Sequence, residues 1–218
     1  MTLHTLNSQN TVLNKFIAQI RDKSIQTDSM RFRRNLERIG EITAYEISKE
    51  LSYTPRVVET PLGEATVETI DDRIVVATIL RAGLPYHQGF LNYFYDAENA
   101  FVSAYRKSTK DGKFTVKVEY ISCGDLEDKV LLLVDPMLAT GSSLVLAYNA
   151  LCEKGGTPKY THVAAVIASE QGIDYVSKNM PRQATTIWAA AVDEELTSRS
   201  YIVPGIGDAG DLAYGEKI

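Results

Sequence analysis

One segment combines an acid with small and hydroxyl-bearing residues in a pattern that suits phosphate binding. The apolar stretch LLLV leads to Asp135, and a Thr-Gly-Ser-Ser turn follows before an apolar helical pattern. Ligands of open α/β sheets bind where strands end and helices begin, and the amides and dipole of a helix N-terminus favour an anion there. Gly141 allows close backbone approach, while Thr140, Ser142 and Ser143 add hydroxyl donors. The segment predicts a site for a phosphate monoester.

Two other interpretations of this segment are a Walker loop and an ordinary strand-to-helix turn. It is not a Walker loop, because no lysine follows the glycine. An ordinary strand-to-helix turn with Ser and Thr caps would show the same local pattern, so this alternative stays open until other segments are considered.

The same segment resembles the hallmark loop of the type I phosphoribosyltransferases. That loop usually has an acidic pair, whereas Pro136 follows the acid here, which is the variant of the uracil phosphoribosyltransferases. Ser142 replaces the second glycine of the uracil-enzyme loop and adds a Cβ at a tight turn, so we expect altered loop geometry with the amides retained. The resemblance covers most of the chain from about Met30 to the end. It implies binding of 5-phosphoribosyl 1-diphosphate (PRPP) by Asp135, Pro136, Met137, Leu138, Ala139, Thr140, Gly141, Ser142 and Ser143.

Two arginines at the ends of predicted strands lie in segments that also match the family, ILRAGL and AYRKST. A guanidinium is a rigid fork for phosphoryl oxygens. Arg81 and Arg106 make poor structural sense unless an anion lies between them, although a surface salt bridge for each is the alternative. The resemblance implies that both bind the diphosphate of PRPP and that Arg106 is catalytic. The polar loop Ser108 to Lys113, which follows Arg106, is expected to be mobile.

The segment YIVPGIGDAGD, residues 201–211, contains three glycines, one proline and two acids. Such a run predicts neither helix nor strand, and its glycines allow the main chain to face a ligand. A flexible tail is the alternative. In the resembling family this segment is the hood that binds uracil, whose edge presents an acceptor, a donor and an acceptor. The resemblance implies that the base is bound by Ile202, Gly207, Asp208 and Ala209.

Asp208 has no obvious helix to cap or strand to join, and in the resembling family this position faces PRPP. We expect it to act in catalysis by anchoring magnesium or a metal-bound water beside the diphosphate. The alternative is a general base for N1 of uracil. We expect no fixed metal site made by the protein alone, with Mg²⁺ carried mainly by PRPP oxygens.

The elements that must position these segments follow from hydrophobic periodicity. Two helical patterns come first, around residues 12–20 and 32–51, with Asp28 or Ser29 as N-cap of the second. A hairpin follows over Arg56 to Ile70. Apolar strands then alternate with helix-length segments, the strands at residues 74–80, 100–105, 114–120, 130–135, 161–168 and 185–192.

This order predicts a single α/β domain over residues 1–218, with an open, mostly parallel sheet flanked by helices on both faces, as in the type I phosphoribosyltransferases. We expect an N-terminal helical part, a β-hairpin arm at about 56–70 and a base-binding hood at about 191–218. The hairpin cannot bury both its faces alone, so it should pack on a helix or on another subunit, and we expect a homodimer or higher oligomer.

Composition excludes several classes of protein. The 218 residues are 44% hydrophobic and 23% charged, as in soluble globular domains. A net charge of -5 gives no general attraction to nucleic acid or to anionic membranes. Two cysteines without zinc spacing, no signal peptide and no apolar stretch long enough to span a bilayer predict a cytoplasmic protein.

The resemblance implies a uracil phosphoribosyltransferase that converts uracil and PRPP to UMP and diphosphate, and this is the function we predict. One alternative is a regulator of the same fold that binds nucleic acid. Another is a purine or xanthine phosphoribosyltransferase, which Pro136 disfavours. The locally basic run at residues 30–34 predicts a solvated helix face, with a GTP effector site, known in some relatives, as the alternative.

Overall fold

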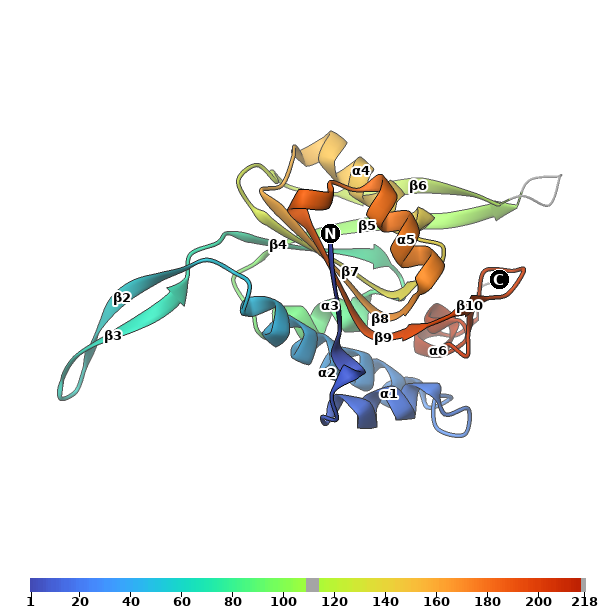
Figure 1. Cartoon of the computed structure of the whole chain (residues 1–218), viewed down its shortest axis with the longest axis horizontal. Helices are drawn as coiled ribbons and strands as arrows, with labels where there is room; N and C mark the ends of the chain where they lie inside the picture. Colours follow the sequence, from blue (N-terminus) through green and yellow to red (C-terminus); the bar gives the residue numbers. More distant parts are fainter. Residues whose placement is uncertain (109–113, 217–218) are drawn as a thin grey trace.

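The computed structural model describes the backbone of residues 1–108 and 114–216, and the side chains of these residues except 104–108 and 114–117. Within these residues the centre of the fold is a seven-stranded sheet in the order β1-β9-β8-β7-β4-β5-β6 (Figure 1). Neighbouring strands are parallel except β5 and β6, which are antiparallel. The strands are β1 (Thr2–Thr5), β4 (Ile74–Leu80), β5 (Glu98–Ser108), β6 (Phe114–Ser122), β7 (Val130–Leu138), β8 (Tyr160–Ser169) and β9 (Thr185–Asp193).

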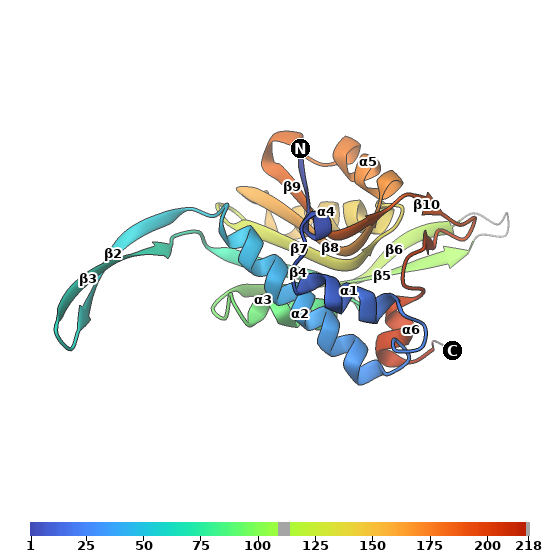
Figure 2. The ribbon, with the colours of Figure 1, turned by 60° about the horizontal axis from the view of Figure 1, so that its bottom comes forward.

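Helices cover both faces of this sheet, as the apolar strands predict. The helices α1 (Leu13–Arg21), α2 (Ser29–Ser48) and α3 (Leu84–Leu91) pack on one face, and Figure 2 shows them below the sheet. The helices α4 (Ser142–Gly155) and α5 (Glu170–Asn179) pack on the other. Side chains alternate along each strand, so Leu132 joins the first core and Leu131 and Leu133 join the second.

Several predicted boundaries need adjustment. Strand β7 does not end at Asp135 but continues to Leu138, because β8 keeps pairing with it as far as Leu138↔Ala168. Helix α2 begins after its predicted N-cap, Asp28, which accepts a hydrogen bond from the Arg31 amide at 3.0 Å, and it ends at Ser48. The edge strand β1 and helix α5 were not predicted. Short 3-10 helices cover Leu6–Ser8 and Arg182–Ala184.

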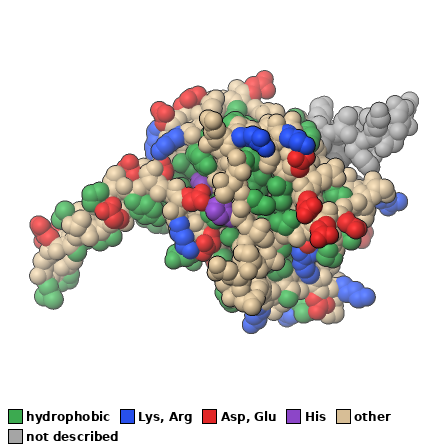
Figure 3. Space-filling model, in the orientation of Figure 1, with side chains coloured by type: hydrophobic (Ala, Val, Ile, Leu, Met, Phe, Trp, Pro, Cys, Tyr) green, Lys and Arg blue, Asp and Glu red, His purple; other side chains and the backbone are tan. Residues whose placement is uncertain are grey.

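The predicted hairpin is confirmed and projects far from the body of the molecule (Figure 1). Its strands are β2 (Tyr53–Thr60) and β3 (Gly63–Ile70), so it starts three residues earlier than the sequence indicated. Hydrophobic side chains lie along its surface (Figure 3), among them Val57 at 62% and Leu62 at 100% exposure. The arm therefore presents apolar surface that the described part of this chain does not cover.

The C-terminal segment is more regular than expected. It contains the short strands β10 (Glu195–Leu196) and β11 (Ile202–Val203), which pair with each other, and helix α6 (Ala209–Tyr214). The prediction that residues 201–211 form neither helix nor strand was wrong at both ends of that range. None of the helices in the described ranges is both long and apolar enough to cross a membrane.

Candidate active site

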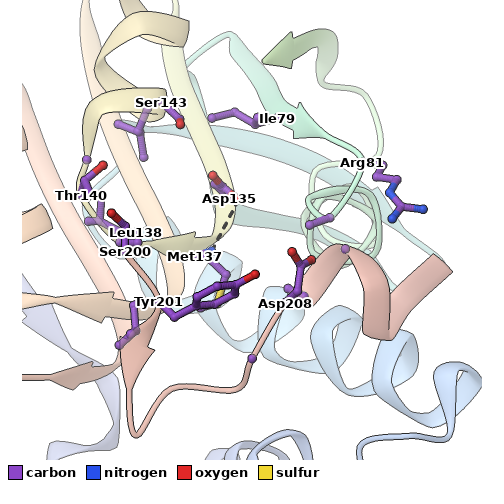
Figure 4. Close-up of a pocket in the computed structure, with 18 of the residues that line it drawn as sticks. Ile79, Arg81, Asp135, Met137, Leu138, Thr140, Ser143, Ser200, Tyr201 and Asp208 are labelled. Atoms are coloured by element: carbon purple, nitrogen blue, oxygen red, sulfur yellow. Dashed lines mark hydrogen bonds between the residues drawn. The ribbon is translucent and has the colours of Figure 1, made fainter. Parts of the chain in front are cut away.

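A cavity of about 600 Å³ lies at the carboxyl ends of β4 and β7, and it joins the segments that the sequence singled out (Figure 4). One wall is the loop after β7, and the opposite wall is the C-terminal hood. The predicted site residues that line it are Arg81, Asp135, Met137, Leu138, Ala139, Thr140, Gly141, Ser143, Ile202, Gly207, Asp208 and Ala209. The predicted PRPP-binding and uracil-binding segments thus share one cavity.

The loop between β7 and α4 has the form expected of an anion site. Gly141 is the N-cap of the 14-residue helix α4 and has a φ of +77°, a backbone conformation that residues with a side chain rarely adopt. A Cβ at Gly141 would also come within 2.8 Å of the Gly172 carbonyl oxygen. The amides at the start of α4 meet the cavity here, where the helix dipole favours a negative group.

This loop is held from the neighbouring strand. The buried Ser169 hydroxyl, at the end of β8, donates to the Ala139 carbonyl at 2.5 Å and accepts from the Gly172 amide at 2.9 Å. The Thr140 and Ser142 hydroxyls are 2.8 Å apart. The loop is therefore tied both to β8 and within itself.

Two residues of the predicted loop are not among those that line the cavity. Pro136 is buried and does not line the cavity, whereas its neighbours Asp135 and Met137 do. The Ser142 hydroxyl is turned back to Thr140. Direct contact of Pro136 and Ser142 with substrate stays a prediction.

Asp135 is half-buried and lies near the carboxyl end of β7, beside the loop. Its Oδ1 accepts a long hydrogen bond of 3.5 Å from the Met137 amide (Figure 4). The carboxylate faces the same space as Thr140 and Asp208, so it can meet a ligand that spans the cavity.

Arg81 follows β4 directly and its guanidinium is partly used within the protein. Its Nη2 donates to Asp211 Oδ1 at 2.8 Å and to the Gly215 carbonyl at 2.7 Å. Its Nε is buried and finds no hydrogen-bond partner among the described residues. The salt bridge that was the alternative for Arg81 exists, and together with the bond to the Gly215 carbonyl it uses only Nη2 of the three guanidinium nitrogens.

Arg106 belongs to β5, where its backbone pairs with Val116 in β6. Its side chain lies outside the described residues, and so do the residues 109–113 of the predicted loop. The position of the Arg106 guanidinium stays a prediction.

Asp208 differs from its prediction, because it has a helix to cap. Its Oδ1 accepts from the Asp211 amide at 3.0 Å, which makes it the N-cap of α6. The small residues of Gly-Asp-Ala-Gly concealed a helix start in the sequence. The carboxylate nevertheless lines the cavity, as expected.

Several residues that line the cavity were not predicted as site residues, although some lie in the segments that the sequence singled out. They are Ile79, Leu80, Ala82, Leu144, Arg199, Ser200, Tyr201 and Gly210. Arg199 adds a second described cation to the cavity wall, and its place inside the predicted hood at about 191–218 was the available signal. The Tyr201 side chain is 44% exposed and points into the cavity toward the side of Asp208 (Figure 4).

Comparisons with known proteins agree with this geometry. The family model described as uracil phosphoribosyltransferase matches residues 7–216, starting nearer the N-terminus than the motifs indicated. A uracil phosphoribosyltransferase of Porphyromonas gingivalis is 57% identical over 213 residues, with 98% of each chain covered. That of Methanothermobacter thermautotrophicus is 40% identical over 208 residues, covering 94% of this chain and 93% of the relative. The solved AQ2163 protein of Aquifex aeolicus is 25% identical, with a TM-score of 0.87 and 100% of both chains covered. The chain therefore belongs to the uracil phosphoribosyltransferase family and has a type I phosphoribosyltransferase fold.

Proposed function

We propose that this enzyme transfers the phosphoribosyl group of PRPP to N1 of uracil, giving UMP and diphosphate. The observation that carries the proposal is the shared cavity. The loop at the N-terminus of α4 forms one wall, and the C-terminal hood, with glycines that expose its main chain, forms the other. In the reaction the C1′–O bond to diphosphate breaks, the N1–C1′ bond forms, and the N1 proton is lost.

The loop wall suits the phosphoribosyl part of PRPP. The Thr140–Ser143 turn holds the 5′-phosphate with backbone amides and hydroxyls, at the positive end of the α4 dipole. Asp135 accepts hydrogen bonds from the ribose hydroxyls, and its negative charge favours the positive charge that grows on the ribose. A fixed charge aimed at a developing charge lowers the barrier more than it strengthens ground-state binding.

Arginines neutralise the diphosphate as it leaves. Arg81 lines the cavity, and this supports a role of its guanidinium as a donor to a diphosphate oxygen. Arg106 is proposed as the second cation because its strand leads toward the same edge of the sheet. Together they act where negative charge develops on the leaving group.

Magnesium fits the donors of this cavity. Among its described lining residues, Asp135 and Asp208 are the two carboxylates, and Mg²⁺ is commonly held by one or two carboxylates together with substrate phosphates. When bound, the ion would neutralise phosphoryl charge. Asp208 is the residue we propose to hold it or one of its waters.

The hood recognises the base by hydrogen bonds from main-chain groups at Ile202 and at residues 207–209. Cytosine has an amino donor in place of one uracil acceptor and an acceptor in place of the N3 donor. Two hydrogen bonds would become contacts of like polarity, at about 1–3 kcal/mol for each buried unpaired group. Discrimination of roughly 10² or more in favour of uracil follows.

Product formation from each base tests the function. The protein is incubated with Mg²⁺, PRPP and either uracil, cytosine, hypoxanthine, guanine or xanthine, with Asp135→Asn as the control for contaminating activity. We expect UMP from uracil and little product from the others. Comparable efficiency on cytosine would refute the proposal that the hood main chain recognises uracil. Preference for a purine would show that the substrate is a purine and not uracil.

Assembly, effector and compartment complete the proposal. We propose a homodimer or larger oligomer that uses the exposed arm. A GTP effector near residues 30–34 stays an untested alternative; there Arg31 and Arg34 form exposed ion pairs with Asp28 and Glu37, and Arg33 donates to a carbonyl of α6. Both cysteines are free thiols, in keeping with the reducing cytoplasm that we expect.

A further inference from the structure

An ion pair between the half-buried Arg21 and the buried Asp193 joins the N-terminal part of the chain to the end of β9. Asp193 is the last residue of β9, and its side chain is only 6% exposed. Arg21, the last residue of α1, donates to both of its oxygens, with Nη1–Oδ2 at 2.8 Å and Nη2–Oδ1 at 2.7 Å. This fork-to-fork geometry fixes the orientation of both side chains.

Both members of the pair also bind the backbone of Gly205. The Gly205 amide donates to Asp193 Oδ2 at 2.9 Å, and the Gly205 carbonyl accepts from Arg21 Nη1 at 3.0 Å. The turn is tight at this point, since Gly205 has a φ of +55° and a Cβ there would collide with the Ile202 carbonyl oxygen. The next carbonyl, that of Ile206, accepts from Gln26 Nε2 at 3.3 Å.

The clamped turn lies between the two parts of the hood that line the cavity. Ile202 precedes it and Gly207 follows it, and both belong to the cavity wall. Arg21, Asp193 and Gly205 themselves are not among the residues that line the cavity. Any influence they have on the base must therefore pass through the backbone of the hood.

We propose that Arg21 and Asp193 are positioning residues that fix the hood backbone for recognition of the base. This inference rests on the proposed function, in which the hood reads uracil through main-chain groups. Backbone donors and acceptors discriminate between bases only when they are held within a few tenths of an ångström of their working positions. The pair thus sets affinity and selectivity for uracil, while PRPP meets the opposite wall.

The test compares Asp193→Asn with a matched control on the other side of the molecule. In the variant, an amide NH₂ replaces one carboxylate oxygen and opposes a donor of Arg21 or Gly205. The control is Asp72→Asn. Asp72 is also 6% exposed, pairs with Lys159 at 2.8 Å and accepts a backbone N–H, that of Ser52. It precedes β4, and so lies at the end of the sheet remote from the cavity.

We expect Asp193→Asn to raise the KM for uracil about tenfold or more, with the KM for PRPP within about twofold of wild type. The rate on cytosine relative to uracil should rise. Hydrogen exchange should accelerate in a peptide covering residues 202–208. Asp72→Asn should lower thermal stability without moving any of these three quantities.

Arg21→Lys and Arg21→Gln provide a second route if Asp193→Asn does not fold. Lysine keeps the charge but not the planar fork, so its effect on uracil KM should fall between those of wild type and glutamine. Equal rises in the KM of both substrates, or an unchanged uracil KM in variants that form UMP, would overturn this inference alone. A wild-type protein that forms no UMP would overturn the proposed function and this inference with it.

Discussion

Arg81 Nη2 lies 2.8 Å from Asp211 Oδ1, and this contact ties the end of β4 to helix α6. The Gly215 carbonyl accepts from the same nitrogen at 2.7 Å, so the C-terminal segment holds the outer edge of the guanidinium. Both contacts use Nη2 alone, and the Nε of Arg81 is buried without a hydrogen-bond partner among the described residues. One guanidinium can thus be oriented by Asp211 and still donate to a phosphoryl oxygen.

The first prediction concerns this pair. Arg81→Ala should lower turnover about 10²–10³-fold, because a cation aimed at the leaving diphosphate is lost. Asp211→Asn should raise the KM for PRPP several-fold and leave the KM for uracil unchanged, since it only loosens the orientation of Arg81. Steady-state kinetics with each substrate varied in turn would measure both effects.

The control for this experiment is Asp174→Asn, which breaks the exposed ion pair with Lys178 on α5. It should change neither constant, because such surface pairs contribute little. Near wild-type turnover of Arg81→Ala would remove Arg81 from the site and leave its ion pair with Asp211 as a purely structural contact.

The segments that carry chemistry were predictable because local rules govern them. An apolar run, a Thr-Gly turn and a helical pattern must form a strand, a tight loop and a helix start, so the wall around Gly141 followed from the sequence. The cap at Asp208 did not follow, since Gly, Ala and Gly around it indicate a turn more strongly than a helix. The Arg21–Asp193 pair spans 172 positions, and no local rule links residues that only the finished fold brings together.

The second prediction separates two roles of Asp208. Asp208→Asn keeps an oxygen that can accept from the Asp211 amide, so the cap of α6 survives and only the charge is lost. We expect a raised apparent KM for PRPP that additional Mg²⁺ partly restores, as metal anchoring requires. A magnesium titration at several PRPP concentrations measures this.

Other outcomes have distinct meanings. A turnover loss of roughly 10²–10⁴ with an altered pH profile and no rescue by magnesium would make Asp208 the general base instead. Unchanged kinetics would remove it from the site. Asp208→Ala, which also loses the cap at a cost of about 0.5–2 kcal/mol, shows how much of any defect is structural.

The third prediction concerns the arm. Light scattering at micromolar concentration should give at least twice the 24.1 kDa chain mass. The double substitution Val57→Asp and Val67→Asp should shift the protein toward the monomer, because these side chains are 62% and 47% exposed on an arm that the described residues leave uncovered. Val12→Asp, at the exposed apolar residue just before α1, is the control. A wild-type particle of strictly one chain would contradict the prediction.

The last prediction follows from His162, a histidine with 2% exposure in β8. Its Nδ1 accepts from Trp188 Nε1 at 3.0 Å, which requires that nitrogen to be unprotonated. Burial lowers the pKa of His162 to about 4, although the nearby Asp72 carboxylate acts in the opposite direction. In the unfolded chain the imidazole takes up its proton near pH 6.5, so the unfolded state binds more protons throughout the interval from about pH 6.5 to pH 4. The free energy of unfolding should therefore fall across that interval by roughly 3 kcal/mol on account of this group.

Urea titrations followed by the fluorescence of Trp188, the only tryptophan in the chain, measure this pH dependence. His162→Gln can still accept from the indole but does not titrate, so its stability should decline less steeply between pH 6.5 and pH 4. Burial also lowers the pKa of His87, so part of the slope should remain in the variant. Asp72 is not a confounding group in this interval: its pKa is lowered, and the stability it contributes is present above about pH 3.8 and lost only as the pH falls below that value. Identical slopes for wild type and His162→Gln would show that His162 takes up its proton without loss of the native state.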